Sequence, residues 1–337
     1  MTRSRLNWLS TILLGGLFLS ACSSERGDRV LEFQALGTEV SVSLYAVTAD
    51  EADEASLQLQ QYMAGIGHDW YPWKEGELRA INIAIELQEP VDVAPRLAAV
   101  IRRAAQVERL SNNRFNAGLG RVTELWGLHR IGNEPPPIPS SSEIARALSQ
   151  AIGVTNIRWT GDRIVGAPPG LMLDLGGIAK GAILEDSRII LRGLEIDNAI
   201  INIGGDLMVV GAVDGRAARI GIRSPVAESA IAAVDIVDGE TIVTSGNYER
   251  YVEIDDVRYS HVLNPRTGMP VNHTSSVTVI DTDPMLADAA ATALMAGGAE
   301  EFEKLTAALG IDYALLIDAS GELSLTTEMD YRLNWLD

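Results

Sequence analysis

Asp174-Leu175-Gly176-Gly177-Ile178-Ala179-Lys180-Gly181 is the most informative stretch of this chain. It follows an apolar run at 171–173 and precedes a segment, 178–192, whose pattern predicts a helix. A carboxylate, two glycines and a lysine therefore stand where we expect a strand to turn into a helix. Glycines allow a ligand to approach the backbone, a helix N-terminus attracts anions, and lysine supplies a point charge for phosphate. The stretch indicates a phosphate site, although a tight turn with a solvated lysine gives the same pattern.

The remaining sequence predicts an α+β fold with mixed or antiparallel sheets and helices packed on them. Helices are expected at 50–66, 94–112, from 141 to about 153, 178–192, 284–296 and 299–309. Strands are expected on both sides of Gly37 within 30–47, and at 197–203, 206–213, 218–223, 231–237, 241–244, 274–281, 313–317 and 322–326. Asp50 and Ser140 suit N-caps, Pro95 suits a first turn, and Gly153 suits a helix end. Without a convincing linker, we expect one domain over 30–337.

The N-terminal residues resemble an export signal. Two arginines precede the apolar run Trp8–Leu19, which is too short to span a membrane comfortably. Leu19-Ser20-Ala21-Cys22 has the small residues of a lipoprotein cleavage box, and Cys22 is the only cysteine. We expect a signal peptide at 1–21, lipidation of Cys22, a tether at 22–29 and a location on the periplasmic face of a bacterial membrane, inner or outer. An ordinary signal peptide with an incidental cysteine is the alternative.

The charge balance argues against nucleic acid as a partner. The chain has 27 basic and 46 acidic residues, and its net charge of −19 becomes −21 when the two arginines of the leader are removed. Phosphate backbones need a basic face. A polyanionic ligand must therefore be held by local features such as a metal ion, a lysine or backbone amides.

Seven segments occur in the order expected for one family, and from the first to the last they span most of the chain after residue 30. They are LGT at 36–38, FNAGLGRVTELWG at 115–127, DLGGIAKG at 174–181, IGGD at 203–206, TSGNYER at 244–250, HVLNPRTGMP at 261–270 and ADAAAT at 287–292. In these motifs the chain resembles the ApbE-type FAD:protein FMN transferases. The resemblance implies an ApbE-like, T-fold-related architecture. It also implies Mg²⁺-dependent transfer of FMN from FAD to a Ser or Thr hydroxyl of an acceptor protein, with release of AMP.

Asp288 and Thr292 are four residues apart on a predicted helix, so they share one face. Their oxygens are the hard ligands that Mg²⁺ prefers, although an exposed Asp beside a helix-facing Thr has the same spacing. The resemblance implies that both bind Mg²⁺ together with the position of Gly177, which offers only its backbone carbonyl. His68, His129 and His273 show no mutual ligand spacing, so we do not expect zinc.

The resemblance also implies roles for residues around the flavin. His261 is expected to act as a base or as a phosphate-positioning group, while Asn264 stands where relatives commonly carry Asp. The expected FAD contacts are Leu36, Asn116, Ala117, Gly118, Asp174, Lys180, Gly204, Gly205 and Ser245. One aromatic among Trp70, Tyr71 and Trp73 is expected on the flavin or adenine, unless it is simply a core residue.

Three other functions remain open at this point. Water in place of the acceptor would make the protein an FAD pyrophosphatase that yields FMN and AMP, and a non-catalytic FAD-binding lipoprotein is also compatible. The chain could itself be an acceptor, since acceptors carry Asp-x-Ser/Thr-Gly/Ala-Ala-Thr. However, residues 288–292 read DAAAT, with alanine in place of the modified hydroxyl. The resemblance points instead to a separate acceptor, such as a subunit of a respiratory ion pump.

Overall fold

The computed structural model describes residues 25–129, 138–151, 153–227, 229–248, 251–254 and 257–336. The expected lipoprotein signal, with Cys22, lies outside the described residues. The helices are α1 (Ala49–Asp69), α2 (Glu77–Leu87), α3 (Pro95–Leu110), α4 (Gly120–Leu125), α5 (Ser141–Gln150), α6 (Ala179–Gly193), α7 (Pro284–Gly297), α8 (Phe302–Leu309) and α9 (Thr327–Arg332), with 3₁₀ turns η1 (Val154–Asn156) and η2 (Ala299–Glu301). The strands are β1 (Gly27–Ala35), β2 (Thr38–Val47), β3 (Val91–Asp92), β4 (Arg158–Thr160), β5 (Arg163–Gly166), β6 (Ala199–Ile203), β7 (Asp206–Val210), β8 (Ala218–Arg223), β9 (Ala230–Ile236), β10 (Thr241–Gly246), β11 (Tyr251–Ile254), β12 (Val257–Ser260), β13 (Thr274–Asp281), β14 (Tyr313–Asp318), β15 (Leu323–Leu325) and β16 (Asn334–Trp335).

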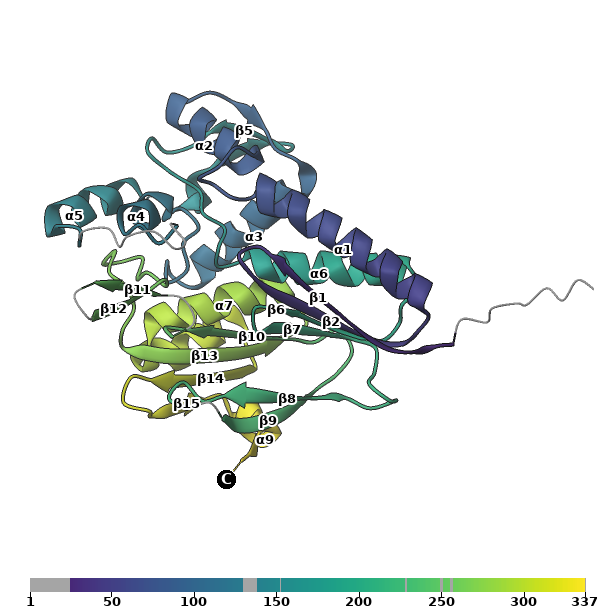
Figure 1. Ribbon diagram of the computed structural model, residues 1–337. Helices are drawn as coiled ribbons and strands as arrows, with labels where there is room; N and C mark the ends of the chain where they lie inside the picture. The colour runs from purple at the N-terminus through teal and green to yellow at the C-terminus, as the bar shows by residue number, and fades with distance from the viewer. Residues whose placement is uncertain are drawn as a thin grey trace, which may run out of the picture.

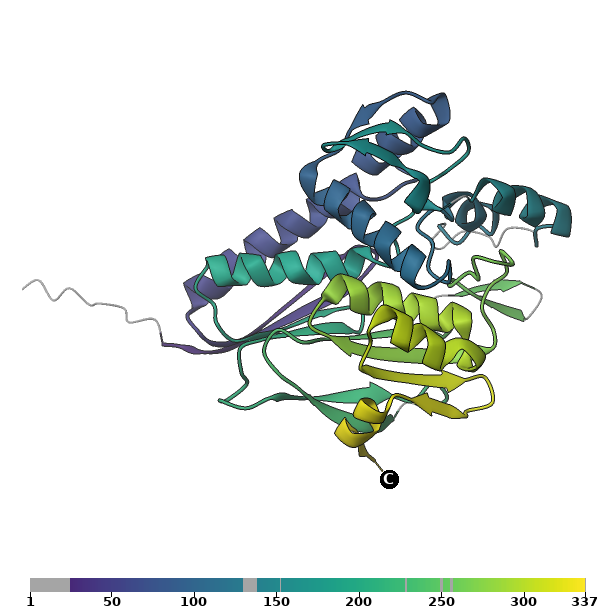
Figure 2. The same ribbon diagram turned by 180° about the vertical axis from the view of Figure 1, so that it is seen from behind.

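The predicted α+β class is confirmed. Eight antiparallel strands form the main sheet in the order β1-β2-β6-β7-β10-β13-β14-β15. Helices α1, α6 and α7 run across one face, whereas the small sheet β16-β9-β8 and helix α9 lie on the other (Figures 1 and 2). Two further small sheets, β3-β5-β4 and β11-β12, lie outside the main sheet. Within the described residues, no helix combines the length and apolar character needed to cross a bilayer.

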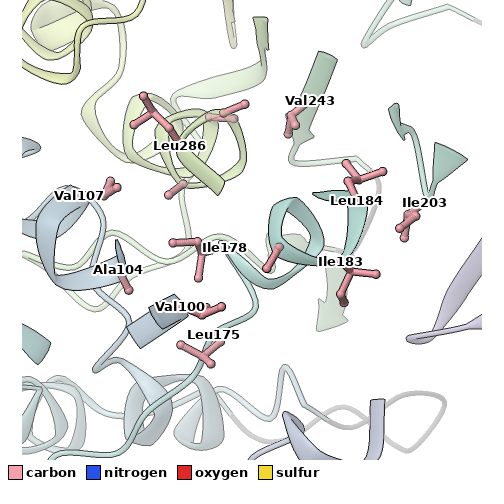
Figure 3. Close-up of a cluster of buried hydrophobic side chains, with 14 of the residues drawn as sticks. Val100, Ala104, Val107, Leu175, Ile178, Ile183, Leu184, Ile203, Val243 and Leu286 are labelled. Carbon is pink, nitrogen blue, oxygen red and sulfur yellow. The ribbon is translucent and has the colours of Figure 1, made fainter. Parts of the chain in front are cut away.

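The diglycine stretch is anchored in the core between the helices and the sheet. Leu175 and Ile178, which flank the two glycines, are 1% and 0% exposed. Figure 3 shows Ile178 between Ala104 of α3 and Leu286 of α7, while Leu175 lies beside Val100 of α3. Burial of one such aliphatic side chain stabilises the fold by roughly 1.5–3 kcal/mol. The turn is therefore held from both sides.

The expected strand before Asp174 is wrong. Met172 forms only an isolated bridge to Leu119, and the segment is otherwise irregular. The buried side chain of Asn82 replaces a neighbouring strand, because its Nδ2 donates to the Leu173 carbonyl at 3.0 Å and its Oδ1 accepts from the Leu173 amide at 2.7 Å. A side-chain amide thus satisfies the backbone groups that a strand partner would otherwise pair.

The predicted caps are correct in part. The N-cap of α1 is Thr48 rather than Asp50, since Thr48 and Glu51 form a reciprocal capping box. Ser140 forms the predicted capping box of α5, and Pro95 opens α3 as expected. The predicted end of α5 at Gly153 is wrong: the helix ends at Gln150, and Gly153 instead precedes η1.

Several boundaries also differ from the sequence expectations. Helices α2, α4 and α9 were not predicted, and the expected helix at 299–309 is divided into η2 and α8. Strand β1 begins at Gly27, so the last three residues assigned to the tether belong to this strand, and Gly27 and Arg29 pair with β2.

Glu301 connects three segments that carry the sequence motifs. Its carboxylate accepts from Arg114 Nε at 2.7 Å and Nη2 at 2.5 Å, and from Arg266 Nη1 at 3.1 Å. Arg114 also donates to the carbonyl of Ala296 near the end of α7, and Arg266 donates to that of Asn112. Hydrogen bonding from Arg114 lowers the pKa of Glu301 to about 2. The carboxylate therefore attaches the loop at 112–118 and the loop at 261–270 to η2, just after α7.

We expect Glu301→Gln to destabilise the protein by about 1 kcal/mol at pH 7, because a bidentate ion pair is replaced by a neutral contact. The loss is modest because solvent already screens part of the ion pair. A carboxyl whose pKa is lowered on folding stabilises the protein above its unfolded pKa of 4.5 and loses that contribution as the pH falls toward 2. The difference between variant and wild type should therefore shrink below about pH 4.5. Urea unfolding at several pH values measures it, with the exposed Glu303→Gln as control. A difference that is independent of pH would contradict this interpretation.

Candidate functional site

The site is built where the N-terminal end of α6 meets α7. A Cβ placed on Gly181 would lie 2.1 Å from the carbonyl oxygen of Pro284, so no residue other than glycine fits there without a shift of the backbone. A Cβ on Gly177 would lie 3.0 Å from Thr292 Oγ1. Meanwhile, the amide of Gly181 donates to Asp288 Oδ2 at 3.0 Å. The structure therefore brings together the three residues that the family resemblance implied as metal ligands.

Asp288 is an ionisable side chain in a buried position. Its residue is 2% exposed, and this burial raises the pKa of the carboxyl to about 7. Lys180 favours the ionised form, Asp206 opposes it, and the Gly181 amide supports it. A buried carboxylate with only partial compensation is a favourable site for a cation.

A second buried carboxylate lies beside the first. Asp206 is fully buried, its Oδ2 forms an ion pair with Lys180 Nζ, and its Oδ1 accepts from the Thr244 amide at 3.1 Å. The sequence analysis selected the two preceding glycines and left out Asp206. The signal was the place of Asp206 in the motif at 203–206, directly after a predicted strand and two glycines, whereas Asp174 precedes its two glycines.

The residues at this junction fit a magnesium ion. Asp288 offers a carboxylate, Thr292 a hydroxyl and Gly177 a backbone carbonyl, all of them hard oxygen donors. Within the described ranges, no group of three His, Cys, Asp or Glu side chains could hold a metal. This donor set suits Mg²⁺, which commonly takes few protein ligands and completes its shell with water and substrate phosphate.

Asp174 joins the diglycine turn to the loop at 116–118. Its Oδ1 accepts from the Gly176 amide and its Oδ2 from Thr123 Oγ1, both at 3.0 Å, while its own amide donates to the Ala117 carbonyl at 2.8 Å. Burial raises the pKa of this carboxyl. Asn116 shapes the same loop, because its Oδ1 accepts from the Gly118 amide at 2.6 Å. Four predicted FAD contacts are therefore neighbours.

The aromatic candidates separate into two groups. Trp70 is 7% exposed and belongs to the main hydrophobic core, which favours the structural alternative for this residue. Tyr71 and Trp73 pack edge to face at 5.4 Å, and Trp73 stacks on His129 at 5.0 Å. The Tyr71 hydroxyl donates to the His129 carbonyl. Burial, with a smaller contribution from the Asp174 charge, raises the pKa of Tyr71, so this aromatic group lies near Asp174.

Four further predicted FAD contacts lie in the main sheet, three of them on its turns and Ser245 near the end of a strand. Gly204 and Gly205 have φ values of +61° and +95°, and a Cβ on Gly204 would lie 2.5 Å from Thr38 Oγ1. Leu36 in the neighbouring hairpin turn has φ of 56°, which is uncommon for a residue with a side chain. Ser245 is partly buried near the end of β10, next to Thr244, whose amide binds Asp206.

His261 is placed by its loop, which begins directly after β12. The residue is partly buried. Trp126 Nε1 donates to the Gly268 carbonyl at 2.7 Å and so fixes the loop on α4, while Asn264 Nδ2 lies 3.5 Å from the Ala296 carbonyl of α7. The loop therefore rests against the helix that carries Asp288 and Thr292. The catalytic role of His261 stays a prediction.

Known proteins are similar to this chain over most of its length. The ApbE family model matches residues 36–315. A FAD:protein FMN transferase of Rhodobacter capsulatus is 34% identical over 301 residues, which cover 89% of this chain but 57% of that protein. The Vibrio cholerae protein of the same name is 30% identical over 87% of this chain and 88% of its own length.

Solved structures of this family share the fold. The ApbE protein of Thermotoga maritima superposes with a TM-score of 0.83 and 28% identity, covering 90% of this chain and 99% of that one. The flavin transferase ApbE of Vibrio cholerae gives 0.79 and 25%, covering 92% and 100%. The sequence motifs, the family model and the common architecture lead to one conclusion: the chain belongs to the ApbE family.

Proposed function

We propose that this protein is a Mg²⁺-dependent FAD:protein FMN transferase that attaches FMN to a Ser or Thr hydroxyl of an acceptor protein and releases AMP. Relatives that bear the transferase name align over most of this chain, and the Vibrio cholerae relative aligns over most of its own length. The observation that carries the proposal is the α6–α7 junction, where the Asp288 carboxylate, the Thr292 hydroxyl and the Gly177 backbone meet beside Lys180.

In this proposal the chain positions the reactants and handles one proton. The acceptor oxygen forms a bond to the FMN-side phosphorus, the bond from that phosphorus to the bridging oxygen breaks, and AMP leaves with that oxygen. His261 takes the hydroxyl proton. Gly177, Asp288 and Thr292 hold Mg²⁺, which when bound neutralises the diphosphate and the departing phosphate. Lys180 and the amides at the start of α6 provide further positive potential toward the diphosphate.

The activity is tested by incubating the mature protein with FAD, Mg²⁺ and a candidate acceptor protein that carries the motif Asp-x-Ser/Thr-Gly/Ala-Ala-Thr. Flavin fluorescence on the acceptor after a denaturing gel is the expected result. FMN released without labelling of the acceptor would show an FAD pyrophosphatase, and intact FAD would show binding only. Subunits of respiratory ion pumps are the acceptors to try first.

Asp288→Asn is expected to reduce transfer by about 100-fold or more, because the variant loses the charged metal ligand. The Asn oxygen still accepts from the Gly181 amide, and the substitution removes a charge whose burial is unfavourable. We therefore expect the metal-free variant at pH 8 to unfold at no lower urea concentration than wild type. Asp330→Asn, an exposed change on α9, is the control. Full transfer by the Asp288 variant at low Mg²⁺ would contradict the assignment.

His261→Gln is expected to slow transfer by about 10²–10⁴-fold, the usual contribution of general-base catalysis. In the wild type the rate should fall as the pH drops through the pKa of an imidazole, about 6.5, and this dependence should vanish in the variant. FAD affinity should change far less. If His261 only positions the phosphate, FAD affinity falls with the rate and the acid limb of the profile survives.

We further propose that the protein is held on the periplasmic face of a membrane by lipid on Cys22, with a short tether before β1. The support is the cleavage box at 19–22 after a short apolar run. Multiple acyl chains anchor stably, whereas one chain binds only marginally. Cys22→Ala is expected to block processing or to release the protein from the membrane fraction. A correctly cleaved variant that still sediments with membranes would contradict the anchor.

A further inference from the structure

The ion pair between Lys180 and Asp206 lies next to the proposed metal ligand. The Asp206 carboxylate is fully buried and contacts the start of α6 through Lys180 and the strand β10 through the Thr244 amide. It is itself the first residue of β7, directly after the glycine turn. One side chain therefore joins three of the segments that the sequence motifs marked.

Lys180 has two buried carboxylates within its electrostatic reach. Lys180 forms an ion pair with Asp206, and its charge also favours the ionised form of Asp288. Asp288 Oδ2 accepts from the amide of Gly181, which directly follows Lys180. Leaving a buried charge without its partner is strongly unfavourable. If the Asp206 charge were absent, the ammonium group would therefore pair with Asp288 and occupy the oxygens that a metal needs.

We propose that Asp206 is a positioning residue that holds the ammonium group of Lys180 away from Asp288 and so keeps Asp288 available to the metal. This inference rests on the proposed function, in which Asp288 binds Mg²⁺. The side chain of Lys180 remains 24% exposed while it is paired.

A simpler explanation is that Asp206 attracts the cation as a second negative charge. The two explanations differ in how the effect of Asp206 depends on Lys180. If Asp206 acts by restraining the lysine, its removal matters only while Lys180 is present. If it acts by its own charge, its removal weakens metal binding by the same factor with or without Lys180.

The test is a double-mutant cycle with Asp206→Asn, Lys180→Met and the double variant. Asn keeps an acceptor for the Thr244 amide. Binding of Mn²⁺ is followed without FAD by the electron paramagnetic resonance signal of the free ion. We expect Asp206→Asn to weaken Mn²⁺ binding about tenfold when Lys180 is present and less than about twofold in the Lys180→Met background, a coupling within the usual range for groups in contact. Equal factors in both backgrounds would overturn the proposal.

Two controls keep the outcomes separate. Asp288→Asn sets the level of binding without the proposed ligand, and a wild type that binds Mn²⁺ no better would contradict both the metal assignment and this inference. Should Asp206→Asn fail to fold, as judged by urea unfolding, the double variant is compared with Lys180→Met alone. Equal Mn²⁺ affinity within about twofold is then the expected result, and a tenfold loss would overturn the inference.

Discussion

The site depends on the close backbone contact between the start of α6 and the start of α7. Gly181 allows the carbonyl of Pro284 to approach to a distance that any Cβ would forbid, and four residues earlier Gly177 lies against Thr292. Because of this contact the Gly181 amide donates to Asp288, and the side chain of Lys180 reaches the buried carboxylate of Asp206. A larger residue at Gly181 would separate the helices, and the proposed ligands would then no longer converge.

Several features of the site are locally unfavourable for folding. Asp288 and Asp206 are buried carboxylates that share the positive charge of Lys180, and Leu36 adopts a left-handed backbone conformation in the adjoining turn. Groups of this kind persist only where the surrounding structure fixes them. The fixing comes from the aliphatic core around Leu175 and Ile178 and from the Glu301 carboxylate. Stability is thus supplied next to the site rather than within it.

Sequence patterns predicted the strands and helices of the main layers because apolar periodicity reports burial directly. They failed at 171–173, where the Asn82 side chain replaces a strand partner, a pairing between residues 91 positions apart that no local pattern reveals. The convergence of Gly177, Asp288 and Thr292 was predictable through family resemblance, whereas helix spacing alone suggested only the last two. The motif at 203–206 included Asp206 but did not reveal its contacts with Lys180 and Thr244, which only the folded chain brings together.

The central claim is that the α6–α7 junction binds the divalent cation that holds the diphosphate of FAD. Crystals grown with FAD and Mn²⁺ test it most directly, because anomalous scattering identifies the ion without reference to the protein. The account predicts one Mn²⁺ peak at about 2.0–2.4 Å from an Asp288 carboxylate oxygen, Thr292 Oγ1 and the Gly177 carbonyl, with phosphate oxygens completing the shell. A Mn²⁺ peak bound to FAD but away from Asp288, or FAD bound with its diphosphate elsewhere, would contradict it.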